Sequence, residues 1–356
     1  MKNIYLQIPG LSQTFPDLVL ATVVQSIGST PQKPGSSAIF GKAGLISGTV
    51  GGGVLEGKVQ EISRNAILSK ESSIPTFYLN KDISEGEDAI CGGQVNVLID
   101  SNPFNHMSVF EKAGESILNQ IPGVLITTVK VFSDHKVLIN RYWMTEKDEP
   151  QIPSDFIQKI EPEVKNMLLK GDRYDFRELE LSVPDSKPSV LCLLEPVFPP
   201  QSLIIAGAGH IGKALSHLGN LLDFEVTVID DRPEYANSKN IPDADHILAK
   251  DIGQAMFELK KNSETYIVIV TRGHKDDAAA LKPCIGSDAA YIGMIGSKNK
   301  VAAMRRNFID NRWATEQQWE TVHAPVGLDI KSKSVEEIAI SIVAELVLIK
   351  NGKEQV

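Results

Sequence analysis

The sequence has few cysteines. Only three occur in 356 residues, Cys91, Cys192 and Cys284, and they lie far apart. This spacing excludes the disulfide framework of a small secreted protein and the paired Cys-x-x-Cys ligands of a structural zinc site. An iron–sulfur cluster ordinarily takes about four thiolates, so the chain cannot hold one by itself.

The sequence also lacks a long apolar run and an excess of positive charge. Residues 1–20 have no basic flank followed by a long apolar core, as a signal peptide would have. Nowhere do about eighteen uncharged apolar residues follow one another, which is the length that spans a membrane. We therefore expect a cytoplasmic protein with no membrane partner. The formal net charge of −9 disfavours binding to nucleic acid.

The length of 356 residues allows two domains with separate hydrophobic cores. The segment PVFPPQS at 196–202 is rich in proline, which prevents both a helix and a central strand. We place the boundary there. The expected units are an N-terminal α/β domain over residues 1–196 and a C-terminal domain over residues 197–356.

Residues 202–232 have the pattern of a dinucleotide-binding fold. An apolar strand at 202–206 leads into the spacing G-x-G-x-x-G, which opens a helix, and a second strand follows. Further strands are expected at 246–249, 266–271 and 290–294, alternating with helices. The sequence therefore predicts a Rossmann-like, doubly wound parallel sheet. The glycines that would permit the turn, the approach of a pyrophosphate and close helix packing are Gly207, Gly209 and Gly212.

The second strand of this pattern ends in an acid. Asp230 suits a ribose diol, whereas the neighbouring Arg232 could meet a phosphate. The two residues leave the choice between NAD and NADP open. Rossmann-type folds also host many unrelated functions, so the ligand has to be argued from the site itself.

Polar side chains follow other strands at the same edge of the predicted sheet. His210 lies in the first helical turn after the glycine pattern, His274 follows the fourth strand, and Ser297 follows the fifth. Because the carboxyl ends of parallel strands form one ligand-binding edge, these residues are candidates to contact a ligand, with the histidines as acid or base. In the structural alternative, Asp276 or Asp277 caps the next helix.

The N-terminal part contains a second glycine turn before a helix. A strand-like run enters Gly51, Gly52 and Gly53, and apolar residues at helical spacing follow. Such a turn can direct several backbone N–H groups toward an anion such as a phosphate. Equally, the glycines could serve geometry alone, with Glu56 as a partner of the helix dipole.

Cys91 precedes the pair Gly92 and Gly93. These glycines could expose a thiolate that contacts a soft metal or carries a persulfide. Most isolated cysteines are small buried hydrophobic residues, and no neighbouring histidine or second cysteine indicates a metal site. The residues alone therefore favour the buried interpretation.

As a set, these motifs resemble the XdhC/CoxI family, accessory factors for molybdenum hydroxylases such as xanthine dehydrogenase. GSTPQKPGSSAIF and GTVGGGVLEGKV resemble the N-terminal domain of the family, and ICGGQVNV resembles its Cys-Gly-Gly segment. GAGHIG, VIDDRPEYAN, TRGHKDDAAAL, YIGMIGSKNK and APVGLDI resemble its C-terminal Rossmann domain. The matching motifs extend over most of the chain.

The resemblance implies a protein that handles a cofactor. It implies binding of molybdenum cofactor, support of its sulfuration, and delivery to apo xanthine dehydrogenase or a related molybdenum hydroxylase, with a cysteine desulfurase as a further partner. By position, Cys91 becomes a candidate contact to molybdenum or its sulfur, and Gly51–Gly53 a candidate cradle for the pterin phosphate. We expect both to face the Rossmann crevice, and we expect a homodimer because symmetric dimers are common.

The glycine fingerprint alone is also consistent with an oxidoreductase that binds NAD(P), with His210 or His274 as acid or base. Xanthine dehydrogenase itself is excluded, because three scattered cysteines cannot hold its electron-transfer clusters. We favour the accessory factor over the catalyst. Whether the Rossmann crevice binds NAD, NADP, molybdopterin or nothing stays open at this point.

Overall fold

The computed structural model describes residues 3–79, 93–147, 152–181 and 190–352. The chain forms two compact units, Met1–Pro199 and Pro200–Val356. Each unit has its own sheets and cores, and each is described by itself below. Cys91 lies outside the described residues.

The first sheet of the N-terminal unit is antiparallel, with five strands in the order β3-β2-β1-β5-β4. Its central strand β1 is apolar at successive positions because both of its faces are covered. Val19 and Ala21 pack with the helix α2, whereas Leu18 and Leu20 pack on the opposite face with α3. The elements are β1 (Val19–Ile27), β2 (Ser37–Gly41), β3 (Gly44–Gly48), α2 (Gly53–Ser69), β4 (Thr76–Leu79), β5 (Gly93–Asp100) and α3 (Met107–Leu118).

A second antiparallel sheet of this unit has the strand order β7-β6-β9-β8. β6 and β7 form an antiparallel hairpin, and the helix α4 covers one face of the sheet. Short helices precede the first sheet and α3. These elements are η1 (Ile4–Gln7), α1 (Ile8–Leu11), η3 (Pro103–His106), β6 (Gly123–Val131), β7 (Val137–Thr145), α4 (Ser154–Lys170), β8 (Arg177–Leu181) and β9 (Val190–Val197).

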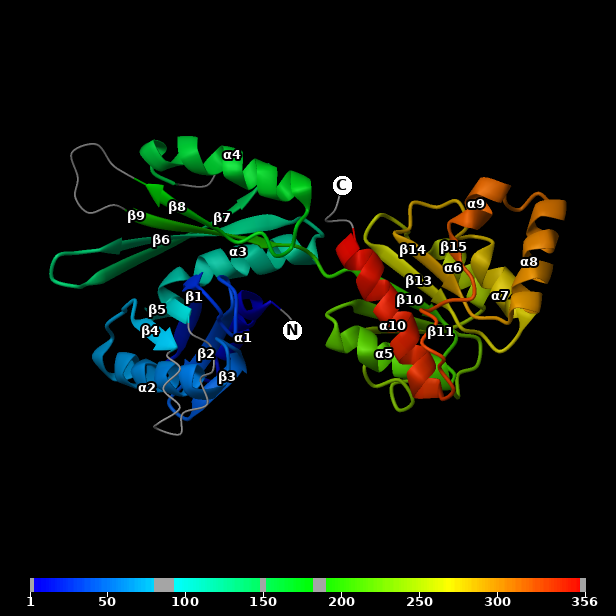
Figure 1. Cartoon of the computed structure of the whole chain (residues 1–356), viewed down its shortest axis with the longest axis horizontal. Helices are drawn as coiled ribbons and strands as arrows, with labels where there is room; N and C mark the ends of the chain where they lie inside the picture. The colour runs from blue at the N-terminus through cyan, green and yellow to red at the C-terminus, as the bar shows by residue number, and fades with distance from the viewer. Residues whose placement is uncertain (1–2, 80–92, 148–151, 182–189, 353–356) are drawn as a thin grey trace. The chain divides into compact units, whose positions relative to one another are not determined.

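The C-terminal unit confirms the predicted Rossmann-like sheet (Figure 1). Six parallel strands lie in the order β12-β11-β10-β13-β14-β15, and the order reverses beside β10, where the glycine turn follows. The strands are β10 (Ser202–Ala206), β11 (Glu225–Asp230), β12 (His246–Ala249), β13 (Thr265–Ile269), β14 (Tyr291–Met294) and β15 (Val322–His323).

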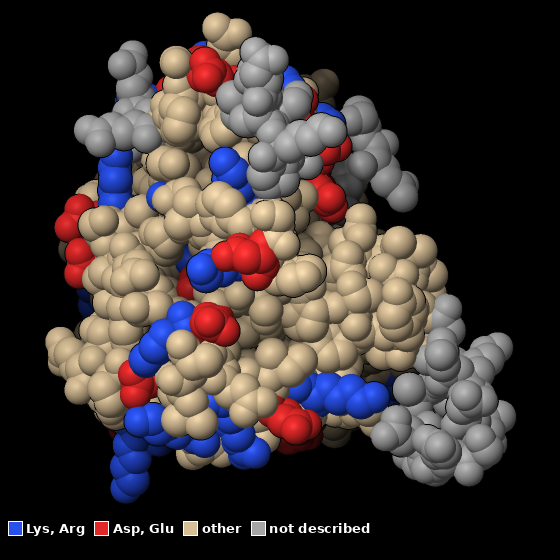
Figure 2. Space-filling model, turned by 90° about the vertical axis from the view of Figure 1, so that its left-hand side faces the viewer, with Lys and Arg blue, Asp and Glu red and all other residues tan. Residues whose placement is uncertain are grey.

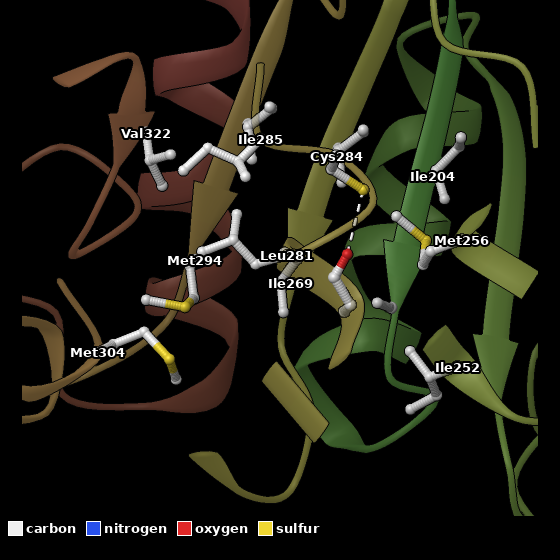
Figure 3. Close-up of a cluster of buried hydrophobic side chains, with 14 of the residues drawn as sticks. Ile204, Ile252, Met256, Ile269, Leu281, Cys284, Ile285, Met294, Met304 and Val322 are labelled. Atoms are coloured by element: carbon white, nitrogen blue, oxygen red, sulfur yellow. Dashed lines mark hydrogen bonds between the residues drawn. The ribbon is translucent and has the colours of Figure 1, made fainter. Parts of the chain in front are cut away.

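Helices cover both faces of this sheet. On one face α5 and the C-terminal helix α10, red in Figure 1, lie side by side over one core. The other core lies under α6 to α9 and includes Cys284, whose thiol donates to the Ala280 carbonyl oxygen at 3.1 Å (Figure 3). The helices are α5 (His210–Leu221), α6 (Ile252–Glu258), α7 (His274–Leu281), α8 (Lys298–Asp310), α9 (Glu316–Glu320) and α10 (Val335–Gly352).

The two described cysteines are core residues. Cys192 in β9 and Cys284 after α7 have no exposed surface, and burial raises the pKa of each thiol to about 12. Such thiols stay protonated and unreactive at neutral pH. In the described part of the chain, no helix is both long enough and apolar enough to cross a membrane.

Candidate functional site

In the glycine turn of the C-terminal unit, packing requires glycine at two of the three positions. A Cβ on Gly207, whose φ is +118°, would lie 2.5 Å from the Val270 carbonyl oxygen. A Cβ on Gly212 would lie 1.8 Å from the Gly207 carbonyl oxygen, because α5 packs directly against the turn. At Gly209 no described residue lies within 4 Å of such an atom. Among the described residues, the start of α5 is therefore open in front of Gly209.

Asp230 at the end of β11 faces this turn rather than solvent. Its Oδ2 accepts the Ala208 N–H at 2.8 Å and the Arg232 Nη2 at 3.0 Å. Its Oδ1 accepts the Arg232 backbone N–H at 3.1 Å and the Arg232 Nε at 2.8 Å. Only 2% of the residue is exposed. Burial opposes ionisation, but the hydrogen bonds from Arg232 and Ala208 outweigh it, and the pKa of Asp230 is lowered.

These hydrogen bonds occupy all the acceptor positions of the Asp230 carboxylate. A carboxylate has about four lone-pair sites, and four donors contact it here. A ribose diol would need two of those positions. Ribose binding at Asp230 therefore requires the Arg232 side chain to move away.

The next strand ends are linked by ion pairs. Arg272, after β13, donates through Nη2 to Asp231 Oδ2 at 2.8 Å and through Nε to Asp276 Oδ2 at 3.2 Å. The buried Asp277 carboxylate accepts the Thr271 hydroxyl at 2.5 Å and pairs with Lys300 of α8. Sequence reasoning missed the Asp277–Lys300 pair, because no local pattern relates residues on successive helices.

The candidate residues on the helix starts have different surroundings. His210 is exposed in the first turn of α5. Ser297 caps α8, with its hydroxyl accepting the Lys300 N–H at 3.3 Å. His274 begins α7 and lines a groove between α7 and α8. The acid or base role expected for His210 and His274 stays a prediction.

The glycine turn of the N-terminal unit starts α2, with Gly52 as its N-cap. Glu56 Oε2 accepts the Thr49 hydroxyl at 2.8 Å and the Val50 N–H at 3.3 Å. The Gly51 N–H donates to Thr49 Oγ1 at 3.1 Å. These hydrogen bonds hold the turn in one shape.

The turn remains open at its tip. Gly52 and Gly53 have φ values of +66° and +54°, and no described residue lies within 4 Å of a Cβ built on either glycine. No described acceptor takes a hydrogen bond from their N–H groups. Two N–H donors at a helix start are therefore available to an anion.

A further cluster, which no sequence pattern indicates, lies inside the N-terminal unit. Tyr5 donates its hydroxyl to Glu195 Oε2 at 2.6 Å, and the buried Arg141 pairs with Asp100. Burial raises the pKa of Glu195 to about 7, against the opposing effects of Tyr5 and Arg141. The adjoining cavity has a volume of about 10 Å³, which is room for a single water molecule. A cavity of this size has no room for a substrate.

Charges on the N-terminal unit are mixed in sign. On the face shown in Figure 2, lysine and arginine side chains lie beside acidic ones on a mostly uncharged surface. The described residues of this face form no broad basic patch for a polyanion.

The comparisons with known proteins agree with the two-part pattern of motifs. The family model described as "XdhC and CoxI family" matches residues 16–77, and the one described as "XdhC Rossmann domain" matches residues 203–346. The chain belongs to the XdhC and CoxI family. This confirms the resemblance drawn from the motifs.

Relatives match over nearly the whole chain. A protein of Bacillus subtilis (strain 168), named as a probable subunit of xanthine dehydrogenase, is 26% identical over 352 residues, covering 98% of this chain and 97% of that protein. The "Uncharacterized protein YqeB" of Escherichia coli (strain K12) is 23% identical over 354 residues, but this chain spans only 47% of its length.

A solved structure has the same fold. The crystal structure described as a xanthine dehydrogenase from Bacillus halodurans matches with a TM-score of 0.78 at 22% identity. The match covers 99% of this chain and 97% of the other. At this identity the likeness concerns the fold alone.

Proposed function

We propose that this protein is an accessory factor of a xanthine dehydrogenase-type enzyme, that it binds molybdenum cofactor, supports its sulfuration and delivers it to the apo-enzyme. The association with such an enzyme is supported by the name of the Bacillus subtilis relative and by membership of the XdhC and CoxI family. The cofactor is here a cargo rather than a resident group.

One observation favours this proposal over a nicotinamide-dependent enzyme: four hydrogen bonds already occupy the Asp230 carboxylate. A Rossmann fold that binds NAD uses this acid for the ribose hydroxyls. In this chain Arg232 and Ala208 already occupy its four lone-pair sites. The helix start that could bind a phosphate is therefore present, but the Asp230 carboxylate that would bind the ribose is already bonded to Arg232 and Ala208.

Open helix starts support the binding of a phosphate-bearing cargo. Gly52 and Gly53 in one unit and Gly209 in the other have free space where a side chain would stand. Backbone N–H groups at helix starts attract phosphate through hydrogen bonds and through the helix dipole. The pterin phosphate of molybdenum cofactor is suited to either place, and we assign it to the Gly51–Gly53 turn.

Cys91 is the proposed contact to molybdenum or its sulfur. The described cysteines Cys192 and Cys284 are buried with raised pKa values and cannot take this role. A thiolate is a soft ligand suited to a soft metal or a sulfide. Cys91 is therefore the only cysteine left for the assignment.

Retention of cofactor by the full chain tests the proposal. The protein is incubated with molybdenum cofactor released from a molybdoenzyme, desalted, and assayed for molybdenum by mass spectrometry and for pterin by fluorescence. We expect both to be retained, and both to be lost in Cys91→Ala, whereas Cys192→Ala serves as the matched cysteine control. Activation of an apo molybdenum hydroxylase by the loaded protein tests delivery.

The second candidate, an NAD(P)-dependent oxidoreductase, is favoured by the glycine pattern alone. Parallel incubation with NADH and NADPH measures it in the same assay. Retention of a nicotinamide with turnover of a small substrate, and no retention of molybdenum, would overturn the proposed function.

A further inference from the structure

An open groove runs between α7 and α8 of the C-terminal unit. It has a volume of about 800 Å³. Its floor consists of small or flexible apolar residues, Ala278 and Ala279 from α7 and Ala303 and Met304 from α8. Met304 is 5% exposed and belongs to the core below, as Figure 3 shows. The groove therefore lies on a packed base.

Contacts at both ends hold the two helices in place. Near their starts, the buried Asp277 of α7 pairs with Lys300 of α8. At the other end, the Lys282 ammonium lies 4.0 Å from the centroid of the Trp313 ring. Trp313 in turn packs edge-on against the buried Phe308 at 5.4 Å between centroids. A groove fixed at both ends is preorganised for a partner.

The rim of the groove carries two lysines, Lys275 and Lys282, and its described lining residues include no acidic residue. A third lining lysine, Lys300, is paired with the buried Asp277. The chain as a whole has a formal net charge of −9. A basic rim around an apolar floor on an acidic protein is complementary to an acidic ligand with one apolar face.

The spacing of the lining residues fits a third helix. From α7 the groove is lined by residues 275, 278, 279 and 282, and from α8 by residues 300, 303, 304 and 307. Both sets follow the i, i+3, i+4, i+7 pattern of a helix face. Alanines at three of these positions allow the backbone of another helix to approach closely. The α7 helix has eight residues, about 12 Å in length, which accommodates about two turns of a partner helix.

The residues that line the groove are too exposed for a small-molecule binding site. Lys275, Ala279, Lys282, Ala303 and Asn307 are all exposed. Sites for small molecules bury about 70–90% of the ligand surface, which an open channel between two helices does not achieve. A helix laid along the channel buries only its apolar face and keeps its charged flanks in water.

We propose that this groove docks an acidic amphipathic helix of a partner protein. The apolar face of that helix lies on Ala278, Ala279, Ala303 and Met304, and its glutamate or aspartate flanks face Lys275 and Lys282. The inference rests on the groove alone and does not depend on the proposed function.

Fluorescence anisotropy with the full chain tests this docking. The probe is a labelled synthetic amphipathic helix with alanine and leucine on one face and glutamate on its flanks, and the control peptide has each glutamate replaced by lysine. We expect the acidic peptide to bind and the basic one not to bind. The double variant Lys275→Glu/Lys282→Glu should weaken binding by about tenfold or more, because it replaces attraction with like-charge repulsion.

Two further variants separate the groove from general electrostatics. Ala279→Arg fills the floor without removing a positive charge, and it should abolish binding. Lys213→Glu changes an exposed lysine of α5, which packs on the other face of the sheet, and should leave affinity within about twofold. Circular dichroism of each variant establishes that the chain is folded.

Equal binding of both peptides, or binding unaffected by Ala279→Arg, would overturn the proposal. So would absence of binding by the folded wild-type chain. Quenching of Trp313 by AMP or NADH without peptide binding would assign the groove to a planar anion instead. A concentration-dependent dimer that Ala279→Arg abolishes would assign it to a second copy of the chain.

Discussion

Replacing Gly212 by alanine measures how tightly α5 packs on the glycine turn. The added Cβ would lie 1.8 Å from the Gly207 carbonyl oxygen and 2.9 Å from the carbonyl carbon. Close carbon–oxygen contacts in proteins are about 3.3 Å, so the turn or the helix has to shift by roughly 1.5 Å. Gly207 cannot shift easily, because its N–H donates to the Ile229 carbonyl oxygen at 2.7 Å.

Two opposing effects set the size of the change. Alanine is favoured over glycine in a helix by about 0.5–1 kcal/mol. Overpacking in a well-packed region costs about 1–3 kcal/mol, and more where backbone is displaced. Because the clash is with backbone, the second effect dominates. We expect Gly212→Ala to lower the free energy of unfolding of the C-terminal unit by about 2 kcal/mol.

Gly57→Ala is the matched control. Gly57 lies in α2, and nothing stands within 4 Å of a Cβ there, so alanine should stabilise the N-terminal unit by about 0.5–1 kcal/mol. Urea unfolding followed by tryptophan fluorescence reports on both units, because Trp143 lies in the N-terminal unit and Trp313 and Trp319 lie in the C-terminal unit. If Gly212→Ala proves as stable as the wild type, the close approach of α5 to the turn does not limit stability, and the argument fails.

The remaining predictions concern ionisation. Glu195 has a pKa of about 7 in the folded chain and an ordinary value of 4.5, so the unfolded chain ionises first and stability falls as pH rises between these values. Glu195→Gln should therefore gain stability over wild type on the order of 1–3 kcal/mol at pH 8 but little at pH 4, as measured by denaturation at both pH values; a constant difference would contradict this. For Asp230 the pKa is lowered, so its contribution is present above about pH 4 and lost on acidification. Asp230→Asn should destabilise the chain by about 2–4 kcal/mol at pH 7, with a difference that shrinks toward pH 3; a difference that grows would refute the sign. Cys192 and Cys284 should react with Ellman's reagent only after unfolding, so any thiol that reacts in the native chain is Cys91, and Cys91→Ser should remove that signal.

Elements with a strong local pattern could be predicted from the sequence. The C-terminal sheet followed from short apolar strands, the glycine spacing and the helical segments between them, since a parallel sheet buries its strands on both faces. The strand-like run before the N-terminal glycine turn is present as β3. The pairing of β1 with β5 could not be predicted, because β5 lies about 70 residues further along the chain and antiparallel pairing leaves no local mark.

The candidate site was predictable only in part. The glycine spacing indicated where the backbone turns, and the structure has Gly207 and Gly212 in places that admit no Cβ. What Asp230 contacts could not be foreseen, because the position of an arginine two residues later depends on how its side chain folds back on the strand end. The groove between α7 and α8 could not be predicted either, because the strand β14 separates the two helices in the sequence.

The hydrogen bond from the Ala208 N–H to Asp230 has a kinetic consequence for whatever occupies the glycine turn. This hydrogen bond connects the turn to the end of β11. Together with the hydrogen bond from the Gly207 N–H to the Ile229 carbonyl oxygen, it fixes the backbone of the turn before a ligand binds. A molecule arriving at α5 then meets a rigid receptor and has no loop to order. Binding of a phosphate at the start of α5, which leaves Arg232 on Asp230, should be a single fast step whose rate rises linearly with concentration, with no slow phase of rearrangement.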